Sequence, residues 1–198
     1  MSHAINDEAL DRLFRNARTF RKFKPDPVRP QMLMAIYDLV RMGPTSVNGN
    51  PARILFLVSK EAKERVKPYL TPGNVAQTMA APVTALIGYD LHFYEFLPKL
   101  ATHKPELAEQ TRNMEPDKRA LIALRSGTLQ AGYFIMAARA IGLVCGPMEG
   151  FDHEGADKEF FPEGHVKSNI LCNLGYGEEP AMRPRAARLS FDEACRIL

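Results

Sequence analysis

The sequence predicts an α+β fold, or an α/β fold with a small mixed sheet, in which short strands are surrounded by helices. Several segments repeat apolar residues at helical spacing, and four short apolar runs have the length of strands. The chain shows no internal repeat and no low-complexity tract. Its 198 residues suit one sizeable core, so we expect residues 1–198 to form a single domain.

Helices are predicted where the apolar period is helical and a capping residue or a proline precedes it. The first covers residues 6–17, with Asn6 or Asp7 as its cap, and the second begins at Pro30. Asn74 is expected to cap a further short helix. Other helices are predicted at residues 60–70 and 116–141, and a helical pattern follows Ser190.

The predicted strands are nearly continuous apolar runs. Such runs are typical of strands that are buried on both faces, whereas a strand with one exposed face alternates apolar and polar residues. The runs cover residues 53–58, 83–89, 143–146 and 169–174.

Small residues follow one side of the predicted helix at residues 116–141, which permits close contact with whatever packs there. This helix is therefore either the central core helix or part of a subunit interface, and the pattern fits both. The small residues are Ala120, Ala123, Gly127, Ala131, Ala137 and Ala138. Residues 91–115, by contrast, show no clear period, and we expect them to form a mobile or substrate-covering segment.

The overall composition argues against several classes of protein. With 45% hydrophobic and 25% charged residues and a net charge of +3, the chain has no basic stripe with interleaved aromatics, so nucleic-acid binding is not expected. The long apolar stretch around residue 139 is interrupted by Arg139, so no membrane span is expected. Three widely spaced cysteines favour a reducing cytoplasm over a disulfide framework.

Common catalytic signatures are missing from the sequence. It contains no GxSxG, P-loop or GxGxxG motif, and its five histidines do not pair at metal-ligand spacing, so no metal site is predicted. Cys145, beside Gly146, has no basic partner nearby in the sequence, which favours a small core residue over a nucleophile.

Two kinds of feature remain as candidate binding elements. The first feature is a set of basic residues near the two ends of the chain. An arginine guanidinium is suited to bind phosphate because its planar fork donates two parallel charged hydrogen bonds. The alternative for each arginine is that it is a solvated surface charge. The basic residues are Arg18, Arg21, Lys22 and Lys24 near one end, and Arg183, Arg185 and Arg188 near the other. The second feature is a pair of polar turns, "GPTSVNGNP" and "CGPMEGFD", which are either simple turns or binding sites for the polar edge of a cofactor.

Four motifs in order resemble those of the FMN-dependent nitroreductase family, and together they span most of the chain. Its Arg-Ser-x-Arg element is similar to Arg18-Thr19-Phe20-Arg21, and its Pro-Ser-x-x-Asn-x-Gln-Pro-Trp loop to "PTSVNGNPA" at residues 44–52. The Pro-x-Glu-Gly-Phe turn is similar to "PMEGF" at 147–151, and the Leu-Gly-Tyr element to "LGY" at 174–176.

The resemblance implies an α+β protein that forms an intertwined homodimer, with two FMN sites that are each built from both chains. One chain would hold the phosphate and ribityl groups through Arg18, Thr19, Arg21 and Arg188. The other would approach the flavin through Pro44, Thr45, Ser46 and Asn48. The turn Pro147, Met148, Glu149 and Gly150 would lie along the ring, and Asn74 and Gln77 would meet its pyrimidine edge.

Departures from the family pattern accompany this resemblance. Gln77 stands where relatives carry a cation that favours the anionic reduced flavin, and Asn50 and Ala52 stand where Gln and Trp are usual. Ala186 replaces a common basic residue, which leaves Arg185 as a substitute. With "GPMEGFD", "KSNILCNLGYG" and "RLSFDEAC", these departures are most similar to the malonic semialdehyde reductases of pyrimidine degradation.

The implied activity is reduction of malonic semialdehyde (3-oxopropanoate) to 3-hydroxypropanoate, with NADH or NADPH as donor and a ping-pong cycle through flavin N5. Candidates for holding the substrate carboxylate or supplying the proton are His92, His103, Lys104, Arg112 and Arg125. Two alternatives remain open: a broad-specificity nitroaromatic or quinone reductase, and a non-catalytic flavin-binding sensor or storage protein.

Overall fold

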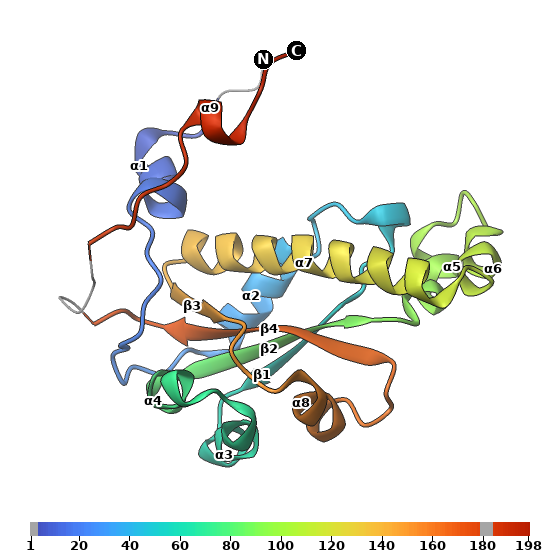
Figure 1. Cartoon of the computed structure of the whole chain (residues 1–198). Coiled ribbons are helices and arrows are strands. Elements are labelled where there is room, and N and C mark those ends of the chain that lie inside the picture. Colours follow the sequence, from blue (N-terminus) through green and yellow to red (C-terminus); the bar gives the residue numbers. More distant parts are fainter. Residues whose placement is uncertain (1–3, 179–183) are drawn as a thin grey trace.

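A sheet lies between two layers of helices in the computed structural model, which describes residues 4–178 and 184–198. Figure 1 shows α2 (Pro30–Val40) and α7 (Pro116–Ala140) on one face of the sheet. The opposite face is covered by α3 (Lys60–Val66), α4 (Pro72–Ala80) and α8 (His153–Phe160). Each layer buries its own apolar cluster against the strands.

The sheet has four strands in the order β1-β2-β4-β3, and every neighbouring pair is antiparallel. The α+β prediction is confirmed, but the expectation of a mixed sheet is wrong. Two helices, α3 and α4, separate β1 from β2, so the chain re-enters the sheet at the end that it left, with Leu57 opposite Thr84. The strands are β1 (Ala52–Leu57), β2 (Val83–Asp90), β3 (Val144–Met148) and β4 (Val166–Gly175).

Burial differs between the edge and the centre of the sheet. Residues of β2 and β4 are mostly buried, as a continuous apolar run predicts. The edge strand β1 is only half-buried from Ala52 to Phe56, so the expectation of a strand buried on both faces is wrong for this run.

The amino-terminal helix is shorter than predicted. It comprises α1 (Asp7–Leu10) and a π-helical turn, η1 (Asp11–Arg15). Its predicted cap is confirmed, because Oδ1 of Asn6 accepts a hydrogen bond of 2.9 Å from the backbone N–H of Ala9.

The predicted cap of α4 is wrong. This helix begins at Pro72, with Thr71 as its cap, and Asn74 lies inside it. Proline at the first helical position sets the start of the helix without a side-chain cap, which leaves the amide of Asn74 for other contacts. The predicted helix at 60–70 likewise ends earlier as α3 and continues as the 3₁₀ turn η3 (Lys67–Tyr69).

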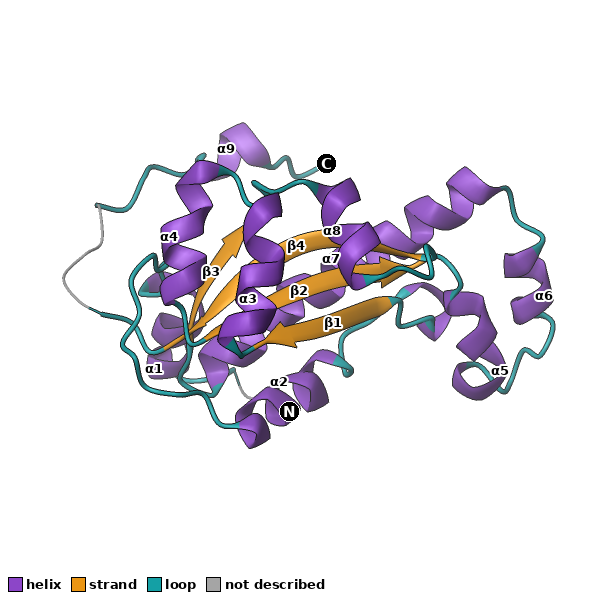
Figure 2. Cartoon of the chain, turned by 90° about the horizontal axis from the view of Figure 1, so that it is seen from below, coloured by secondary structure: helices purple, strands orange, loops and turns teal. Residues whose placement is uncertain are grey.

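Residues 91–115 form short helices beside the sheet (Figure 2). They are η4 (Phe93–Phe96), α5 (Leu97–Leu100) and α6 (Leu107–Arg112). A small apolar cluster of Tyr94, Leu97 and Ala101 holds them together. The expected role of this segment in covering the substrate stays a prediction.

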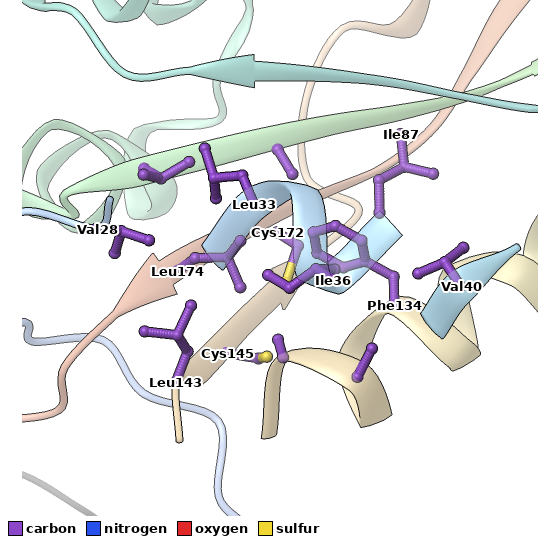
Figure 3. Close-up of a cluster of buried hydrophobic side chains, with 14 of the residues drawn as sticks. Val28, Leu33, Ile36, Val40, Ile87, Phe134, Leu143, Cys145, Cys172 and Leu174 are labelled. Atoms are coloured by element: carbon purple, nitrogen blue, oxygen red, sulfur yellow. The ribbon is translucent and has the colours of Figure 1, made fainter. Parts of the chain in front are cut away.

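The larger core lies between α2, α7 and the sheet (Figure 3). Phe134 and Ile36 are fully buried there, and Cys145 is buried with them, as expected of a small core residue. A hydrogen bond with Cys145, together with burial, raises the pKa of the Cys172 thiol well above its usual value. The buried Cys172 thiol is therefore a poor nucleophile.

Gly127 allows α7 to approach the sheet closely. A Cβ atom at this position would lie 2.9 Å from Cβ of Tyr89 on β2. The same face of α7 also buries Ala123, Ala131 and Ala138. One of the two alternatives for the small-residue stripe, a core helix, is thus confirmed.

The carboxyl-terminal tail extends away from the sheet (Figure 1), and its Arg185 contacts the carbonyl of Arg15 at the end of η1. It carries one helical turn, α9 (Phe191–Ala194), at which Ser190 N donates to Glu193 Oε2 at 2.8 Å. Residues 184–198 are all exposed. Over the described ranges, no helix combines the length and the apolar character needed to cross a membrane.

The packing predicts that Phe134→Ala destabilises the protein by about 3–5 kcal/mol, because it removes a fully buried ring and leaves a cavity. Urea unfolding followed by circular dichroism measures the change. Val58→Ala, at a side chain that is 51% exposed, is the matched control and is expected to cost less than about 0.5 kcal/mol. Equal destabilisation by both substitutions would contradict this account of the core.

Candidate functional site

The segment Arg18-Thr19-Phe20-Arg21 lies beside β3. Thr19 and Cys145 form an isolated parallel bridge, and the N–H of Phe20 donates to the carbonyl of Cys145 at 3.0 Å. Gly146 permits this approach, because a Cβ there would lie 2.6 Å from the Phe20 carbonyl oxygen. The amino-terminal arginines are thus fixed near the start of β3.

The turn at the end of β3 is held by α4. The carbonyl oxygen of Gly150 accepts hydrogen bonds from Asn74 Nδ2 at 2.8 Å, from Thr71 N at 3.1 Å and from Thr71 Oγ1 at 2.9 Å. Three donors on one carbonyl fix the orientation of this peptide group. The amide of Asn74 is therefore a positioning group for the turn.

Gln77 joins the same cluster one helical turn further on. Its Nε2 donates to Asn74 Oδ1 at 2.7 Å and lies 3.4 Å from Sδ of Met148. Arg21 and Gln77 also line a common hollow of about 390 Å³. The structure therefore brings the predicted residues of α4, of the β3 turn and of the amino-terminal segment to one end of the sheet.

The polar loop, residues 43–51, lies elsewhere and packs on α7 and α5. The N–H of Ser46 donates to Ser126 Oγ at 3.2 Å, and Asn48 Nδ2 donates to the Leu100 carbonyl at 2.8 Å. The φ angles of Val47 and Asn48 are 50° and 57°, a left-handed conformation that is unfavourable for a β-branched residue. Strain of this kind is common at binding sites.

Asn50 holds the polar loop in shape. Its N–H donates to Thr45 Oγ1 at 3.2 Å, and its Nδ2 donates to the Asn48 carbonyl at 2.8 Å. Gln130 of α7 donates to Asn50 Oδ1 at 3.2 Å and accepts from the N–H of Ala52 at 2.9 Å. Gln130 was not predicted from the sequence. A single amide among the small residues on one face of a helix does, however, indicate a buried polar contact.

A buried carboxylate fixes the other side of this loop. Asp90 is 2% exposed, and Arg53 Nη2 lies 2.5 Å from its Oδ2. Arg53 Nη1 also donates to the Asn50 carbonyl at 3.1 Å, while the N–H of His92 donates to Asp90 Oδ1 at 2.7 Å. The ion pair thus links the polar loop to the start of the 91–115 segment, and it too was missed.

The carboxyl-terminal arginines differ in their contacts. Arg185 Nη2 donates to the carbonyls of Arg15 at 2.6 Å and Ala17 at 2.8 Å, which places it next to the segment that contains Arg18. Arg188 instead donates to carbonyls of its own tail, those of Ala186 and Ala187. Arg183 lies outside the described residues.

Two separate groups therefore result from the predicted site residues. The first lies around β3 and α4, and the second is the polar loop near α5. Figure 1 shows these elements at opposite ends of α7. The first group contains Arg18, Thr19, Arg21, Asn74, Gln77, Pro147, Met148, Gly150 and Arg185, and the second contains Pro44, Thr45, Ser46 and Asn48.

A large groove of about 1340 Å³ runs along the outer face of α7. Its apolar part includes Phe14, Leu129 and Tyr133, whose side chains are exposed. Its polar lining is formed by Arg125, Thr128, Arg139, Glu149 and Asn169. Glu149, which follows Met148 in the β3 turn, thus faces this groove.

Residues 14–176 match the model of the nitroreductase family. The chain belongs to this family. The chain is 52% identical over 197 residues to a protein of Stenotrophomonas maltophilia (strain K279a) that is named as a candidate NADH dehydrogenase/NAD(P)H nitroreductase. The alignment covers 100% of both chains. The family of oxidoreductases predicted from the motifs is thereby confirmed.

Solved structures of nitroreductases share the fold. A candidate nitroreductase of Exiguobacterium sibiricum, solved in complex with FMN, superposes with a TM-score of 0.87 at 17% identity over 100% of both chains. A candidate NAD(P)H:FMN oxidoreductase of Staphylococcus epidermidis gives a TM-score of 0.84 at 22% identity, over 100% of this chain and 98% of the other. At these identities the comparison establishes the architecture.

The hydrogen bonds at Gly150 lead to a prediction about this nitroreductase. A Cβ at position 150 would lie 2.7 Å from Thr71 Oγ1 and 2.8 Å from Asn74 Nδ2, so Gly150→Ala should destabilise the protein by about 1–3 kcal/mol. Gly73→Ala is the control: no atom lies within 4 Å of its Cβ position, and within α4 it should be neutral or stabilising by up to about 1 kcal/mol. Urea midpoints measure both changes, and a neutral Gly150→Ala would contradict the tight packing of the turn.

Proposed function

We propose that this nitroreductase binds FMN and transfers reducing equivalents from NADH or NADPH to a small organic acceptor in a ping-pong cycle. The observation that carries the proposal is the meeting of the amino-terminal arginines, the amides of α4 and the β3 turn at one end of the sheet. Bound FMN would supply the N5 atom that accepts and donates hydride. The chain itself supplies binding, orientation and charge.

The side chains in this region fit the chemistry of FMN. Guanidinium groups of Arg18, Arg21 and Arg185, with the hydroxyl of Thr19, suit a phosphate and a ribityl chain. The amides of Asn74 and Gln77 offer both donors and acceptors to the pyrimidine edge of the ring. Pro147, Met148, Glu149 and Gly150 would lie along the ring, and Arg188 of the extended tail would join the phosphate site.

We propose that the protein acts as a homodimer. The exposed apolar residues along the groove, including Leu129 and Tyr133, are a surface that a second copy of this chain would cover. The exposed tail would pack on that copy. Such a dimer accounts for the distance between the two groups of site residues, because Pro44, Thr45, Ser46 and Asn48 would then reach the cofactor bound by the neighbouring chain.

The proposed acceptor is malonic semialdehyde, which would be reduced to 3-hydroxypropanoate. This rests on the similarity of "GPMEGFD", "KSNILCNLGYG" and "RLSFDEAC" to the reductases of pyrimidine degradation. The aldehyde carbon gains a hydride and its oxygen gains a proton while one NAD(P)H is oxidised. Residues 1–198 would form a single domain in which 91–115 covers the substrate, and the three free thiols are compatible with a cytoplasmic location.

A second candidate function is a broad-specificity nitroaromatic or quinone reductase. The wide apolar groove favours it, because flat aromatic acceptors bind to apolar surfaces. The ratio of kcat/KM for 3-oxopropanoate to that for a nitroaromatic separates the two functions. If malonic semialdehyde is the acceptor, we expect kcat/KM for 3-oxopropanoate to be far larger than kcat/KM for the nitroaromatic.

Flavin reduction is the first test of the proposal. We expect the purified protein to be yellow with FMN, and anaerobic NADH or NADPH to bleach its visible absorption band within seconds to minutes. A bound flavin that is not bleached would support a sensor or storage protein instead. A colourless protein that takes up no FMN would remove the cofactor from the proposal.

A charged substitution in the groove tests whether the protein forms a dimer through this surface. Leu129→Glu places a charge on the surface that the second copy would cover, and burial of an unpaired charge is costly, so we expect light scattering to show one chain mass instead of two. Val58→Glu is the matched control at another exposed site, and it should remain a dimer. A monomeric wild-type protein would contradict the proposed assembly.

A further inference from the structure

Arg125 is an exposed cation on α7 that lines the groove beside Thr128 and Leu129. Within the described ranges, 4–178 and 184–198, its guanidinium forms no hydrogen bond and no ion pair. The walls of the groove are largely apolar, and a charge at such a wall attracts an opposite charge more strongly than one in open water. A free guanidinium at this place is therefore suited to bind an anion.

On one side, Arg125 adjoins the polar loop. Ser126, the next residue, accepts the hydrogen bond of 3.2 Å from the N–H of Ser46. The loop that we propose to approach the flavin is thus attached to α7 directly beside Arg125.

On the other side, Arg125 shares the groove with the end of the β3 turn. Thr128, three residues further along α7, accepts a hydrogen bond of 2.9 Å from Asn169 Nδ2. Asn169 lies two residues before Leu171, which pairs with Met148 in the sheet. Glu149 follows Met148 and lines the same groove, so Arg125 adjoins the polar loop and shares one groove with the β3 turn.

The other cations proposed for substrate binding are engaged or lie outside the groove. The ring of His92 stacks on that of His165 with centroids 4.8 Å apart, and Arg112 lies 5.5 Å from the ring centroid of Tyr94. His103 and Lys104 are exposed in the turn between α5 and α6 and do not line the groove.

Arg139, the other arginine that lines the groove, is also engaged. Its Nη1 donates to the Leu13 carbonyl at 2.9 Å. Among the arginines of the groove lining, Arg125 thus offers its full set of donors to a ligand.

We propose that Arg125 binds the carboxylate of the acceptor, and that the enzyme therefore prefers short aldehydes that carry a carboxylate over uncharged ones. This inference rests on the proposed function and specifies the substrate class of the same site. The planar guanidinium would donate two parallel hydrogen bonds to the carboxylate and orient the aldehyde relative to the cofactor. Arg125 determines specificity and transfers no proton or hydride itself.

Binding of malonate, a carboxylate of similar length that has no aldehyde to reduce, tests the site without turnover. Isothermal titration calorimetry on the wild-type protein is expected to show binding that weakens at least tenfold in Arg125→Met. Arg125→Lys, which keeps the charge and loses the fork, should give an intermediate affinity. Lys118→Met removes an exposed charge from the same helix outside the groove and should change the affinity less than twofold.

Kinetics with two aldehydes provides the second measurement. The ratio of kcat/KM for 3-oxopropanoate to kcat/KM for propanal should fall about 10- to 100-fold in Arg125→Met, mainly through KM for the charged aldehyde. The ratio should stay within twofold of wild type in Lys118→Met. Thermal melting of each variant shows whether it is folded.

The outcomes separate this inference from the proposed function. The role of Arg125 would be overturned if Arg125→Met left both the affinity for malonate and the ratio of kcat/KM for 3-oxopropanoate to that for propanal unchanged. This holds even if the wild-type enzyme reduces 3-oxopropanoate well. A wild-type protein that binds malonate through Arg125 and reduces neither aldehyde would keep the anion site and overturn the proposed acceptor. Absence of malonate binding to the wild-type protein would overturn the site.

Discussion

The close packing of α7 on the sheet is the contact on which the rest of the molecule depends. Gly127 lets the helix approach β2, and Phe134 fills the space between α7, α2 and the strands. A rigid helix fixed in this way presents two further surfaces. Ser126 and Gln130 turn toward the polar loop, while the outer face with Leu129 lines the groove. A shift of α7 would therefore move the loop and the groove together.

Polar groups at both ends of the sheet are arranged to hold backbone rather than to perform chemistry themselves. Three donors fix the Gly150 carbonyl at the β3 turn. At the opposite end, the buried Asp90 carboxylate pairs with the half-buried Arg53, which supports the loop around Asn50. A buried charge is tolerated only when it is paired and hydrogen-bonded, and the Asp90 carboxylate meets both conditions through Arg53 and the N–H of His92. Preorganised backbone of this kind suits a protein whose cofactor carries the redox step.

The proposed dimer would account for both the separation of the two groups of site residues and the open groove along α7. In it, α7 would pack its small-residue stripe on the sheet and present its outer face, with Leu129 and Tyr133, to the second copy. Arg125 lies at the boundary between these faces, next to Ser126 and in the same groove as Glu149. A substrate bound there would lie beside the polar loop and in the same groove as Glu149 of the β3 turn.

The sequence alone determined the α+β class, the approximate positions of the strands and of helices such as α2 and α7, and the family, because apolar periodicity and short motifs are local properties of a chain. Only the tertiary structure decided that the sheet is antiparallel, that Asn74 holds Gly150 instead of capping α4, and that Gln130, Arg53 and Asp90 support the polar loop. These features depend on hydrogen bonds between residues far apart in the chain, such as the 78 positions that separate Ala52 from Gln130, and no local pattern encodes which distant groups will meet.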